Sequence, residues 1–205
     1  MDKATHTESS TEGFVEERVI YNGAEATISL GTWHGFKVAR KWRRPKPYRI
    51  EALDETLRRT RTVHEAQLLH DSKEAGVPVP TVLLLSPEEG TLLLSYIDGE
   101  RLREILDVSE PDERVSQCRQ VGAMAGRLHA TGIVHGDLTT SNMILGVDRR
   151  IFLIDFGLGS YSWESEDMGV DLLLMRRALN STHYRIADEC FRAFMEGYWE
   201  ELGPD

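Results

Sequence analysis

The stretch "VHGDLTTSNMIL", residues 134–145, holds an aspartate and an asparagine five residues apart in a polar loop with apolar residues on either side. A second acidic motif, "IFLIDFG" at residues 151–157, follows within the length of one strand. It places Asp155 at the end of an apolar run, two residues before a glycine that lets the chain turn sharply. The two motifs together therefore predict a small cluster of carboxylate and amide side chains at a strand's edge.

Each polar residue of these motifs suits a different task. A carboxylate at Asp155 is suited to a hard divalent cation, and Asn142 can supply a second oxygen to the same metal. Asp137 is then left to accept a proton or to orient a nucleophile. Taken singly, these residues could be a turn former, a cap and a solubilising strand end, but their joint placement favours metal-assisted chemistry.

Phosphoryl transfer requires metal ions that neutralise charge, a fixed cation on the phosphates and a base that positions the attacking oxygen. Lys41, at the end of a predicted strand, is the candidate cation, and Glu65, on the following helix, is its candidate partner. Protein kinases carry these residue types in the same order, which here is Lys41, Glu65, Asp137, Asn142 and Asp155. The sequence therefore predicts a kinase-like fold.

The first half of the chain has the pattern of an N-lobe. Residues 1–17 are polar and lack periodicity, which predicts a disordered leader. Short apolar runs broken by glycines predict three antiparallel strands between Val19 and Trp42, and two more follow Pro80. Helical spacing from Ala52 to Glu74 predicts one helix between the two groups of strands. We therefore expect a β-rich N-lobe over residues 18–96.

The second half is dominated by helical patterns. Helices are expected over "GERLREIL", from Arg114 to Ala130 and across most of residues 167–202, with two short strands around the turn "VDRR". We expect a helical C-lobe over residues 97–205. The predicted fold class is therefore α+β: a miniature two-lobed kinase-like fold with a shortened activation segment.

Composition and charge narrow the functional classes. The chain of 205 residues is 40% hydrophobic and 28% charged, with a formal net charge of −10, which argues against a general nucleic-acid-binding surface. The segment from Arg40 to Arg61 departs from this, with nine basic and three acidic residues, and suggests a phosphate-bearing ligand or partner. The alternative is an ordinary solvated face.

The sequence predicts neither a membrane-spanning segment nor a zinc site. The sequence lacks an apolar run long enough to span a bilayer, and we expect a cytoplasmic protein, or also a nuclear one in a eukaryote, without membrane association. Cys118 and Cys190 have no Cys or His at metal-ligand spacing around them, so we expect buried thiols rather than a zinc site.

Several features of an ordinary protein kinase are missing. The loop that should read G-x-G-x-x-G is "YNGAEAT", in which Gly23 survives and Glu25 stands where flexibility is expected. Gly136 replaces an arginine that would bind a phosphorylated activation segment, and Thr139 replaces a lysine near the γ-phosphate. The expected nucleotide site thus retains Gly23 but lacks the usual glycine-rich cover.

The segment after the second motif is also short. Thirteen residues separate Gly157 from Asp171, and no A-P-E motif follows, so the chain has little material for a peptide-substrate platform. Asp171 could anchor the catalytic loop from below, or could be a helix N-terminal acid. His135 is expected to pack and bond to backbone. The link between the lobes would offer backbone groups to an adenine ring, at Ser95, Tyr96 and Ile97.

These motifs together resemble one family, the small atypical serine/threonine kinase subunit of the KEOPS (EKC) complex. The resemblance runs from about Tyr21 to about Ala178 and rests on several stretches: "GAEA", "KWRRPKPYR", "LDETLRRTRTVHEA", "GVPVP", "IVHGDLTTSNMIL", "IDFGLG" and "EDMGVDL". The combination of "HGDLTTSN" with "PKPYR" is specific, because it is not a general kinase pattern.

The resemblance implies an enzyme that binds ATP and Mg²⁺, with Lys41 and Glu65 as an ion pair, Asp137 as the catalytic aspartate, and Asn142 and Asp155 as metal ligands. The family combines serine autophosphorylation with ATP hydrolysis coupled to threonylcarbamoyl modification of an adenosine in tRNA. It implies as partners the threonylcarbamoyl-transfer subunit and a small regulatory subunit, with tRNA reached through the complex. This chain stops at "WEELGPD", whereas family members commonly end in a short basic tail.

Two alternatives stay open beside this interpretation. One is a RIO-like serine kinase, which also has a short activation segment but against which "PKPYR" and "DFGLG" argue. The other is a kinase fold that serves as a scaffold or allosteric regulator of a partner. The second is disfavoured because every polar residue that the chemistry needs is present.

Overall fold

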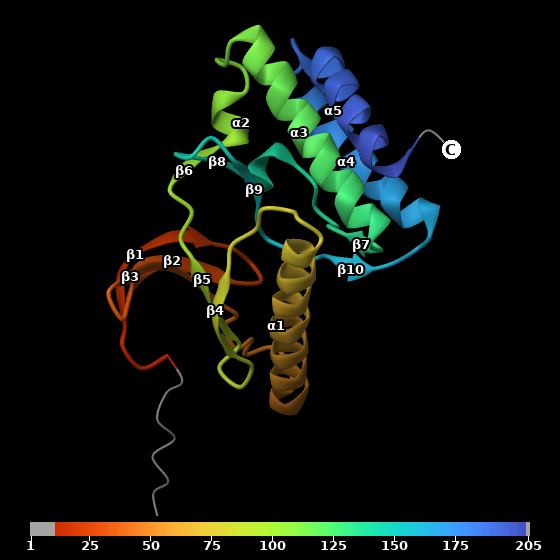
Figure 1. The fold of residues 1–205 in the computed structure, drawn as a ribbon. Coiled ribbons are helices and arrows are strands. Elements are labelled where there is room, and N and C mark those ends of the chain that lie inside the picture. The colour runs from red at the N-terminus through yellow and green to blue at the C-terminus, as the bar shows by residue number, and fades with distance from the viewer. Residues whose placement is uncertain (1–10, 204–205) are drawn as a thin grey trace, which may run out of the picture. The chain divides into compact units, whose positions relative to one another are not determined.

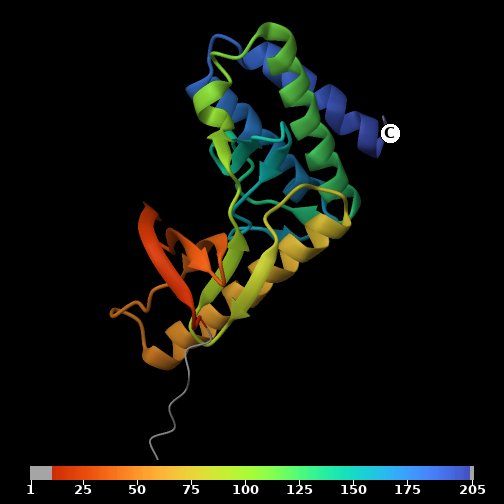
Figure 2. The same cartoon turned by 60° about the vertical axis from the view of Figure 1, so that its left-hand side comes forward.

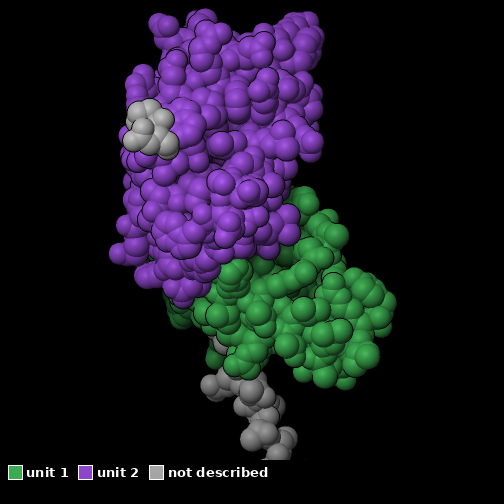
Figure 3. Space-filling view, turned by 90° about the vertical axis from the view of Figure 1, so that its right-hand side faces the viewer, with its two compact units in different colours: residues 1–66, 81–96 green, residues 67–80, 97–205 purple. Residues whose placement is uncertain are grey.

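The computed structural model describes residues 11–203. The chain divides into two compact units, residues 1–66 with 81–96, and residues 67–80 with 97–205 (Figure 3). The first unit is built on a β-sheet and the second mainly on helices. The predicted α+β, kinase-like class is therefore confirmed.

The sheet of unit 1 is antiparallel and has five strands in the order β1-β2-β3-β5-β4 (Figure 1). Strand β3 lies in its centre, where Lys41 pairs with Ile28 on one side and with Leu92 on the other. The buried side chains of Val38 and Leu92 form part of the core beneath it. The strands are β1 (Phe14–Asn22), β2 (Thr27–Trp33), β3 (Phe36–Trp42), β4 (Val82–Ser86) and β5 (Thr91–Ser95).

The expected N-terminal leader is too long, because its last residues belong to strand β1. The leader was expected to reach residue 17, but β1 begins at Phe14 and pairs with β2 from Trp33 onward. Most of β1 is exposed, so its sequence lacks the alternation of apolar and polar residues by which strands are detected. The first ten residues of the expected leader lie outside the described part of the chain.

Helix α1 (Glu51–Glu74) follows "RPKPYR" and continues from unit 1 into unit 2. The prolines in that segment cannot extend a helix, which places the helix start after them. The carboxylate of Asp54 is buried and accepts hydrogen bonds from the backbone N–H of Lys46 and the side chains of Arg49 and Arg58, at 2.9–3.3 Å. The segment before α1 is therefore fixed onto the first turns of the helix.

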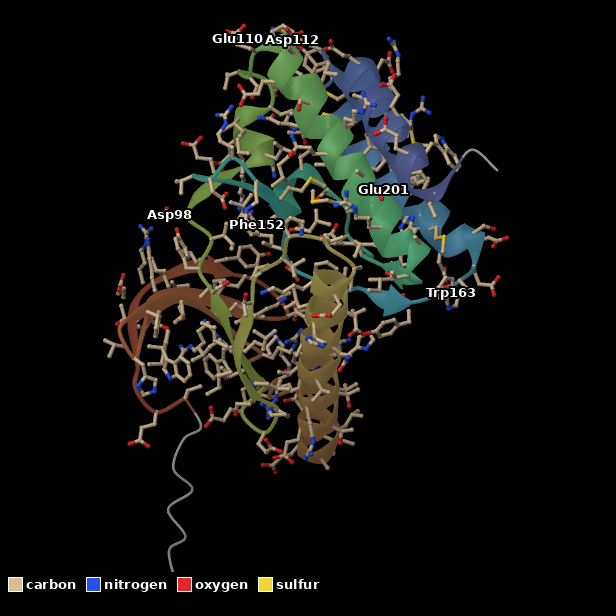
Figure 4. The ribbon with its side chains drawn as sticks, in the orientation of Figure 1. Asp98, Glu110, Asp112, Phe152, Trp163 and Glu201 are labelled. Carbon is tan, nitrogen blue, oxygen red and sulfur yellow. The ribbon has the colours of Figure 1, made fainter. Side chains whose placement is uncertain are left out.

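Two long helices form the centre of unit 2. Helices α3 (Pro111–Ala130) and α5 (Ala187–Leu202) lie side by side (Figure 1, Figure 2). A Cβ on Gly122 would lie 1.8 Å from the Phe194 carbonyl oxygen, and one on Gly197 would lie 2.0 Å from that of Arg119. Only glycine allows the two backbones to approach this closely. Glu201 of α5, labelled in Figure 4, also pairs with Arg127 of α3 at 2.8 Å.

Helix α4 (Ser165–Thr182) and several short elements complete unit 2. Strands β6, β8 and β9 form a three-stranded sheet, and β7 pairs with β10. The short elements are β6 (Gly99–Arg101), α2 (Leu102–Ile105), β7 (Ile133–Val134), the 3-10 helix η1 (Thr140–Asn142), β8 (Met143–Gly146), β9 (Ile151–Leu153) and β10 (Ser160–Tyr161).

The helix expected over "GERLREIL" is only partly present. Residues 99–101 pair with β8, and the helix is limited to the single turn α2. Leu102 and Leu106 are fully buried, so the packing of these leucines fixes the turn. The strand pairing at residues 99–101 depends on a partner far along the chain, and local helical spacing does not reveal it.

The two cysteines are buried, as expected. Cys118 of α3 and Cys190 of α5 are buried free thiols. Their mutual hydrogen bond, followed by burial, raises the pKa of the Cys118 thiol. Between residues 11 and 203 no helix combines the length and the apolarity that crossing a bilayer requires.

Candidate active site

The first group of candidate residues lies in unit 1 and centres on Glu65. The Lys41 Nζ atom lies 2.6 Å from Glu65 Oε1, so the expected ion pair is present. The Arg43 Nη2 atom lies 2.5 Å from the other carboxylate oxygen, Oε2. Lys41, Arg43 and Glu65 are exposed by only 6%, 4% and 1%. One buried carboxylate therefore holds two cations.

Strand and helix periodicity explain how these residues meet. Lys41 and Arg43 are two positions apart along the path of β3, so their side chains leave the same face of the sheet. The backbone N–H of Arg43 donates to Gly90 at 2.9 Å, which continues this path one residue beyond the strand. Glu65 and Thr62 lie one turn apart on α1, and Arg43 Nη1 also donates to Thr62 Oγ1 at 3.4 Å.

The loop expected to cover the phosphates is a short turn between β1 and β2. The Gly23 N–H donates to the Ala26 carbonyl at 3.0 Å. Lys46 donates to the carbonyl of Ala24, and Arg61 pairs with Glu25. Side chains from the segment before α1 and from α1 itself therefore hold "GAEA", where an ordinary kinase has a mobile glycine-rich loop.

Two of the three residues expected at the adenine, Ser95 and Tyr96, are already engaged within unit 1. Ser95 donates its N–H to Thr81 and accepts the Thr81 N–H on its hydroxyl, both at 2.9 Å. The Tyr96 N–H donates to Lys37 at 3.4 Å, and the Lys37 ammonium lies 4.1 Å from the centre of the Tyr96 ring. Ile97 begins the unit-2 segment and is half-buried. A role of these residues in binding adenine stays a prediction.

The second group lies in unit 2, in the loop between β7 and β8. Asn142 Nδ2 donates to Asp137 Oδ2 at 2.7 Å and to the Asp137 carbonyl at 3.0 Å. Because both acceptors belong to Asp137, the NH₂ group of the Asn142 amide must face Asp137. The Asn142 Oδ1 atom therefore faces away from Asp137. The Ile154 N–H donates to the Asn142 carbonyl at 3.0 Å, which ties the residue before Asp155 to this loop.

Asp155 has a backbone conformation that is rare for a residue with a side chain. Its φ is +64°, and its Oδ1 atom accepts the Gly157 N–H at 3.2 Å. Non-glycine residues in this region are uncommon and cluster at functional sites, where the surrounding structure holds them. Asp155 and Asn142 carry the kinds of oxygen donor that Mg²⁺ prefers.

This donor set would fit Mg²⁺ if substrate phosphates and water supplied the remaining ligands. Over the described residues, His, Cys, Asp and Glu form no group of three that could hold a metal alone. Magnesium is commonly bound through one or two protein carboxylates together with substrate phosphates and water. One carboxylate and one amide oxygen are therefore enough protein ligands for such a magnesium site.

Asp171 of α4 anchors the loop, as its position suggested. It is fully buried, and its carboxylate accepts the N–H groups of His135 and Gly136 at 2.7 and 2.9 Å. It also accepts from His129 Nε2 at 3.3 Å, while Tyr198 donates to His129 Nδ1 at 2.9 Å. Burial, with the charge of Asp171, raises the pKa of Tyr198, which keeps that hydroxyl protonated.

The backbone around position 136 requires a glycine there, apart from any loss of an arginine. Its φ is +78°, and a Cβ there would lie 2.2 Å from the Leu158 carbonyl oxygen. A side chain at this position would meet the chain after Asp155 and would also strain the backbone. The residue type thus follows from the close approach of two loops within unit 2.

His135 packs and bonds to backbone as expected. Its ring lies 4.5 Å from that of Phe156, its Nε2 atom donates to the Ile154 carbonyl, and its Nδ1 atom accepts the Asp137 N–H. Burial lowers the pKa of His135 despite the carboxylates around it, so the ring is neutral. A neutral ring explains how one nitrogen can donate and the other accept.

Sequence reasoning missed two supports of the site. Arg43 was counted as a surface cation, although its alternation with Lys41 along one strand could have shown that it faces inward. The second support is His183, which is fully buried and bonds to Thr140 Oγ1 of the loop at 3.2 Å and to Asp107 at 2.8 Å. It lies far along the chain from the loop, and no local motif marks it.

The basic segment is largely neutralised. Arg43 and Arg58 are mostly buried and paired with acids, and ion pairs also involve the more exposed Arg59 and Arg61. Arg43 and Arg58 are therefore not part of an exposed surface for a phosphate-bearing partner, which the basic segment had suggested. Arg44 and Arg59 remain exposed.

Known proteins resemble this chain over most of its length. A RIO domain model matches residues 36–161. The KEOPS complex subunit Bud32 of Pyrococcus abyssi is 43% identical over 92% of this chain and 88% of its own. Bifunctional tRNA threonylcarbamoyladenosine biosynthesis proteins of Methanothermobacter thermautotrophicus and Methanocaldococcus jannaschii are 42% and 36% identical, over 91% and 90% of this chain. The chain spans about a third of the length of these two relatives, 34% and 33%.

These matches correct one contrast drawn from the sequence. The stretches "PKPYR" and "DFGLG" were weighed against a RIO-like kinase, but the same chain matches both the RIO domain and the KEOPS subunit. The two are therefore not alternatives at the level of the domain.

Proposed function

This chain belongs to the RIO-domain family of the KEOPS complex subunit Bud32, and on that premise we propose that it is an Mg²⁺-ATP-dependent phosphotransferase and ATPase. In this role it would serve threonylcarbamoyl modification of tRNA within a KEOPS complex. The observation that carries the proposal is the loop between β7 and β8, in which Asn142 donates to Asp137 and which the buried Asp171 anchors. The Ile154 N–H, next to Asp155, bonds to the same loop at Asn142.

The residues divide the work as follows. Asp155 and Asn142 would hold Mg²⁺, which neutralises charge that develops on the phosphates when it is bound. Lys41, kept in place by Glu65, would bind the phosphate chain of ATP. Asp137 would orient the attacking hydroxyl or water and accept its proton as the oxygen bonds to the γ-phosphorus and ADP leaves.

The acceptor of the phosphoryl group follows from what the chain lacks. Only residues 158–170 lie between Gly157 and Asp171, too few for the platform on which ordinary kinases bind a peptide. This favours water, or a serine of the protein itself, as the acceptor. The proposed partners are the threonylcarbamoyl-transfer subunit and a small regulatory subunit of the complex, with tRNA bound through the complex.

The distribution of a γ-labelled phosphate tests this proposal. The chain is incubated with labelled ATP, Mg²⁺, its transfer-subunit partner and tRNA, and Asp155→Ala serves as the blank because it removes the carboxylate of the metal site. We expect label to appear as free phosphate, at a rate that the partner and tRNA increase. Label that stays on serines of this chain whatever the tRNA concentration would identify autophosphorylation, rather than hydrolysis, as the reaction. Label on serines of another protein would identify a protein kinase with a separate substrate, and equal release by Asp155→Ala would overturn the site.

A second experiment tests the remaining exposed cations as an RNA surface. Arg44→Glu together with Arg59→Glu should weaken tRNA binding by the assembled complex, and the slope of log K against log salt should fall by about 1 to 2 because one or two phosphate contacts are lost. Arg119→Glu is the matched control, since Arg119 is an exposed arginine paired with an acid on α5. If the double variant has unchanged affinity and slope, these cations do not bind RNA, and the ATP site is unaffected by that result.

A further inference from the structure

We infer that Arg43 is a positioning residue that keeps Glu65 in contact with Lys41 whether or not a nucleotide or a partner is bound. The inference rests on the proposed ATP site and goes beyond it, because it concerns how that site is regulated. Its basis is the shared carboxylate, of which one oxygen bonds to Lys41 and the other to Arg43 at 2.6 and 2.5 Å.

Because Arg43 also pairs with Glu65, moving α1 so that Glu65 leaves Lys41 would be unfavourable in free energy. In protein kinases the corresponding Lys–Glu pair is made and broken by movement of the helix, which the activation segment controls. Here such a movement would break two ion pairs at once and leave the Arg43 guanidinium, 4% exposed, with only the long hydrogen bond to Thr62. Separating one partner from a buried ion pair is strongly unfavourable.

A second contact opposes the same movement. One turn inside the start of α1, Asp54 accepts hydrogen bonds from Lys46, Arg49 and Arg58, as described above. Burial opposes ionisation of Asp54, but these hydrogen bonds outweigh it and lower its pKa. Helix α1 is thus held at two points. Asp54 binds it to the segment that follows β3, and Glu65 binds it to Lys41 and Arg43 along the path of β3.

The consequence is a site without the usual switch. The chain has neither a long activation segment nor an arginine at Gly136 to read its phosphorylation. Arg43 replaces that variable control with a permanent contact inside unit 1. The Lys41–Glu65 pair is then formed in the isolated chain, and any partner must act on another part of the protein.

A double-mutant cycle separates positioning from a merely structural role. Arg43→Met, Glu65→Gln and the double variant are compared with the wild type by kcat and KM for Mg²⁺-ATP hydrolysis, the equilibrium Kd for Mg²⁺-ATP and the urea midpoint of unfolding. We expect Arg43→Met to lower kcat by about 10- to 100-fold, as a displaced catalytic group does, with a smaller rise in KM. In the Glu65→Gln background the same change should lower kcat by less than about twofold, because Arg43 acts only through Glu65.

Two further variants serve as controls. Arg40→Met is matched, because Arg40 lies on β3 with its side chain on the opposite face and pairs with Glu16 of β1 at 2.7 Å. It should keep kcat within about twofold of the wild type, since partly exposed pairs contribute little. Arg43→Lys retains the charge and should recover part of the kcat lost in Arg43→Met, which guards against a variant that fails to fold.

The outcomes separate this inference from the proposed function. If the wild type does not bind Mg²⁺-ATP, the proposed function is wrong and the inference falls with it. If the wild type binds and turns over ATP, but Arg43→Met leaves kcat unchanged or lowers it equally in both backgrounds, only the positioning role is overturned.

Discussion

Replacing Asp137 with asparagine should lower turnover of Mg²⁺-ATP by about 10²- to 10⁴-fold, which is the usual contribution of a general base. Asparagine keeps an oxygen that can accept the 2.7 Å hydrogen bond from Asn142, so the loop retains its shape while the basic carboxylate is lost. The affinity for Mg²⁺-ATP should therefore change little. Steady-state hydrolysis and an equilibrium nucleotide titration on the same sample measure the two effects separately.

Asp148→Asn is the control for this experiment. Asp148 also lies in unit 2, but it is an exposed residue paired with Arg150 in the turn between β8 and β9. Its replacement should leave both kcat and the nucleotide affinity at the wild-type level. An Asp137→Asn protein that hydrolyses ATP normally, or that supports tRNA modification at the wild-type rate in the assembled complex, would instead favour a scaffold or an allosteric regulator.

Replacing Asp171 with alanine should destabilise the protein by about 3 kcal/mol, because it leaves several buried donors without an acceptor. The carboxylate accepts from the N–H groups of His135 and Gly136 and from His129, and both histidines are almost fully buried, so water does not replace the carboxylate there. Urea unfolding measures the loss as a lower midpoint. Turnover should fall as well, since the loop that carries Asp137 loses its anchor.

A matched acid on the same helix tests whether the effect is specific. Asp167 lies in the first turn of α4 and is exposed, so Asp167→Ala removes only a favourable interaction with the helix dipole. The expected loss is below about 1 kcal/mol. Equal midpoints for the wild type and Asp171→Ala would show that water or a rearranged loop replaces the carboxylate, and would contradict the role of Asp171 as anchor.

Much of the fold could be predicted because its signals are local. The strands β2 to β5 and helices α1, α3, α4 and α5 follow from periodicity and from breakers such as "RPKPYR" and "AGVPVP". The candidate site residues were chosen from the sequence because five polar residues in the order Lys41, Glu65, Asp137, Asn142 and Asp155 are rarely a coincidence. The first residues of β1, from Phe14, escaped detection because they are mostly exposed, and β6 escaped it because only its pairing with β8 makes it a strand.

The supports of the site were harder to predict because they depend on tertiary contacts. His183 meets Thr140 across 43 positions of the chain, and Tyr198 meets His129 across 69. Arg43 was predicted on the surface because a cation is usually solvated. It is buried because Glu65, on another element, forms an ion pair with it. A sequence shows which groups could carry chemistry more readily than it shows which groups hold them.

The chain of contacts from Tyr198 through His129 to Asp171 has a consequence for biosynthesis. The ribosome makes the loop of residues 133–142 well before α4 and α5, and domains are completed in the order in which their parts emerge. Until α4 supplies Asp171, the N–H groups of His135 and Gly136 must be satisfied by water, and until α5 supplies Tyr198 the His129 that also bonds to Asp171 lacks its hydroxyl partner. The nascent protein therefore acquires the finished loop around Asp137 only late in translation, and the proposed ATP chemistry must wait until then.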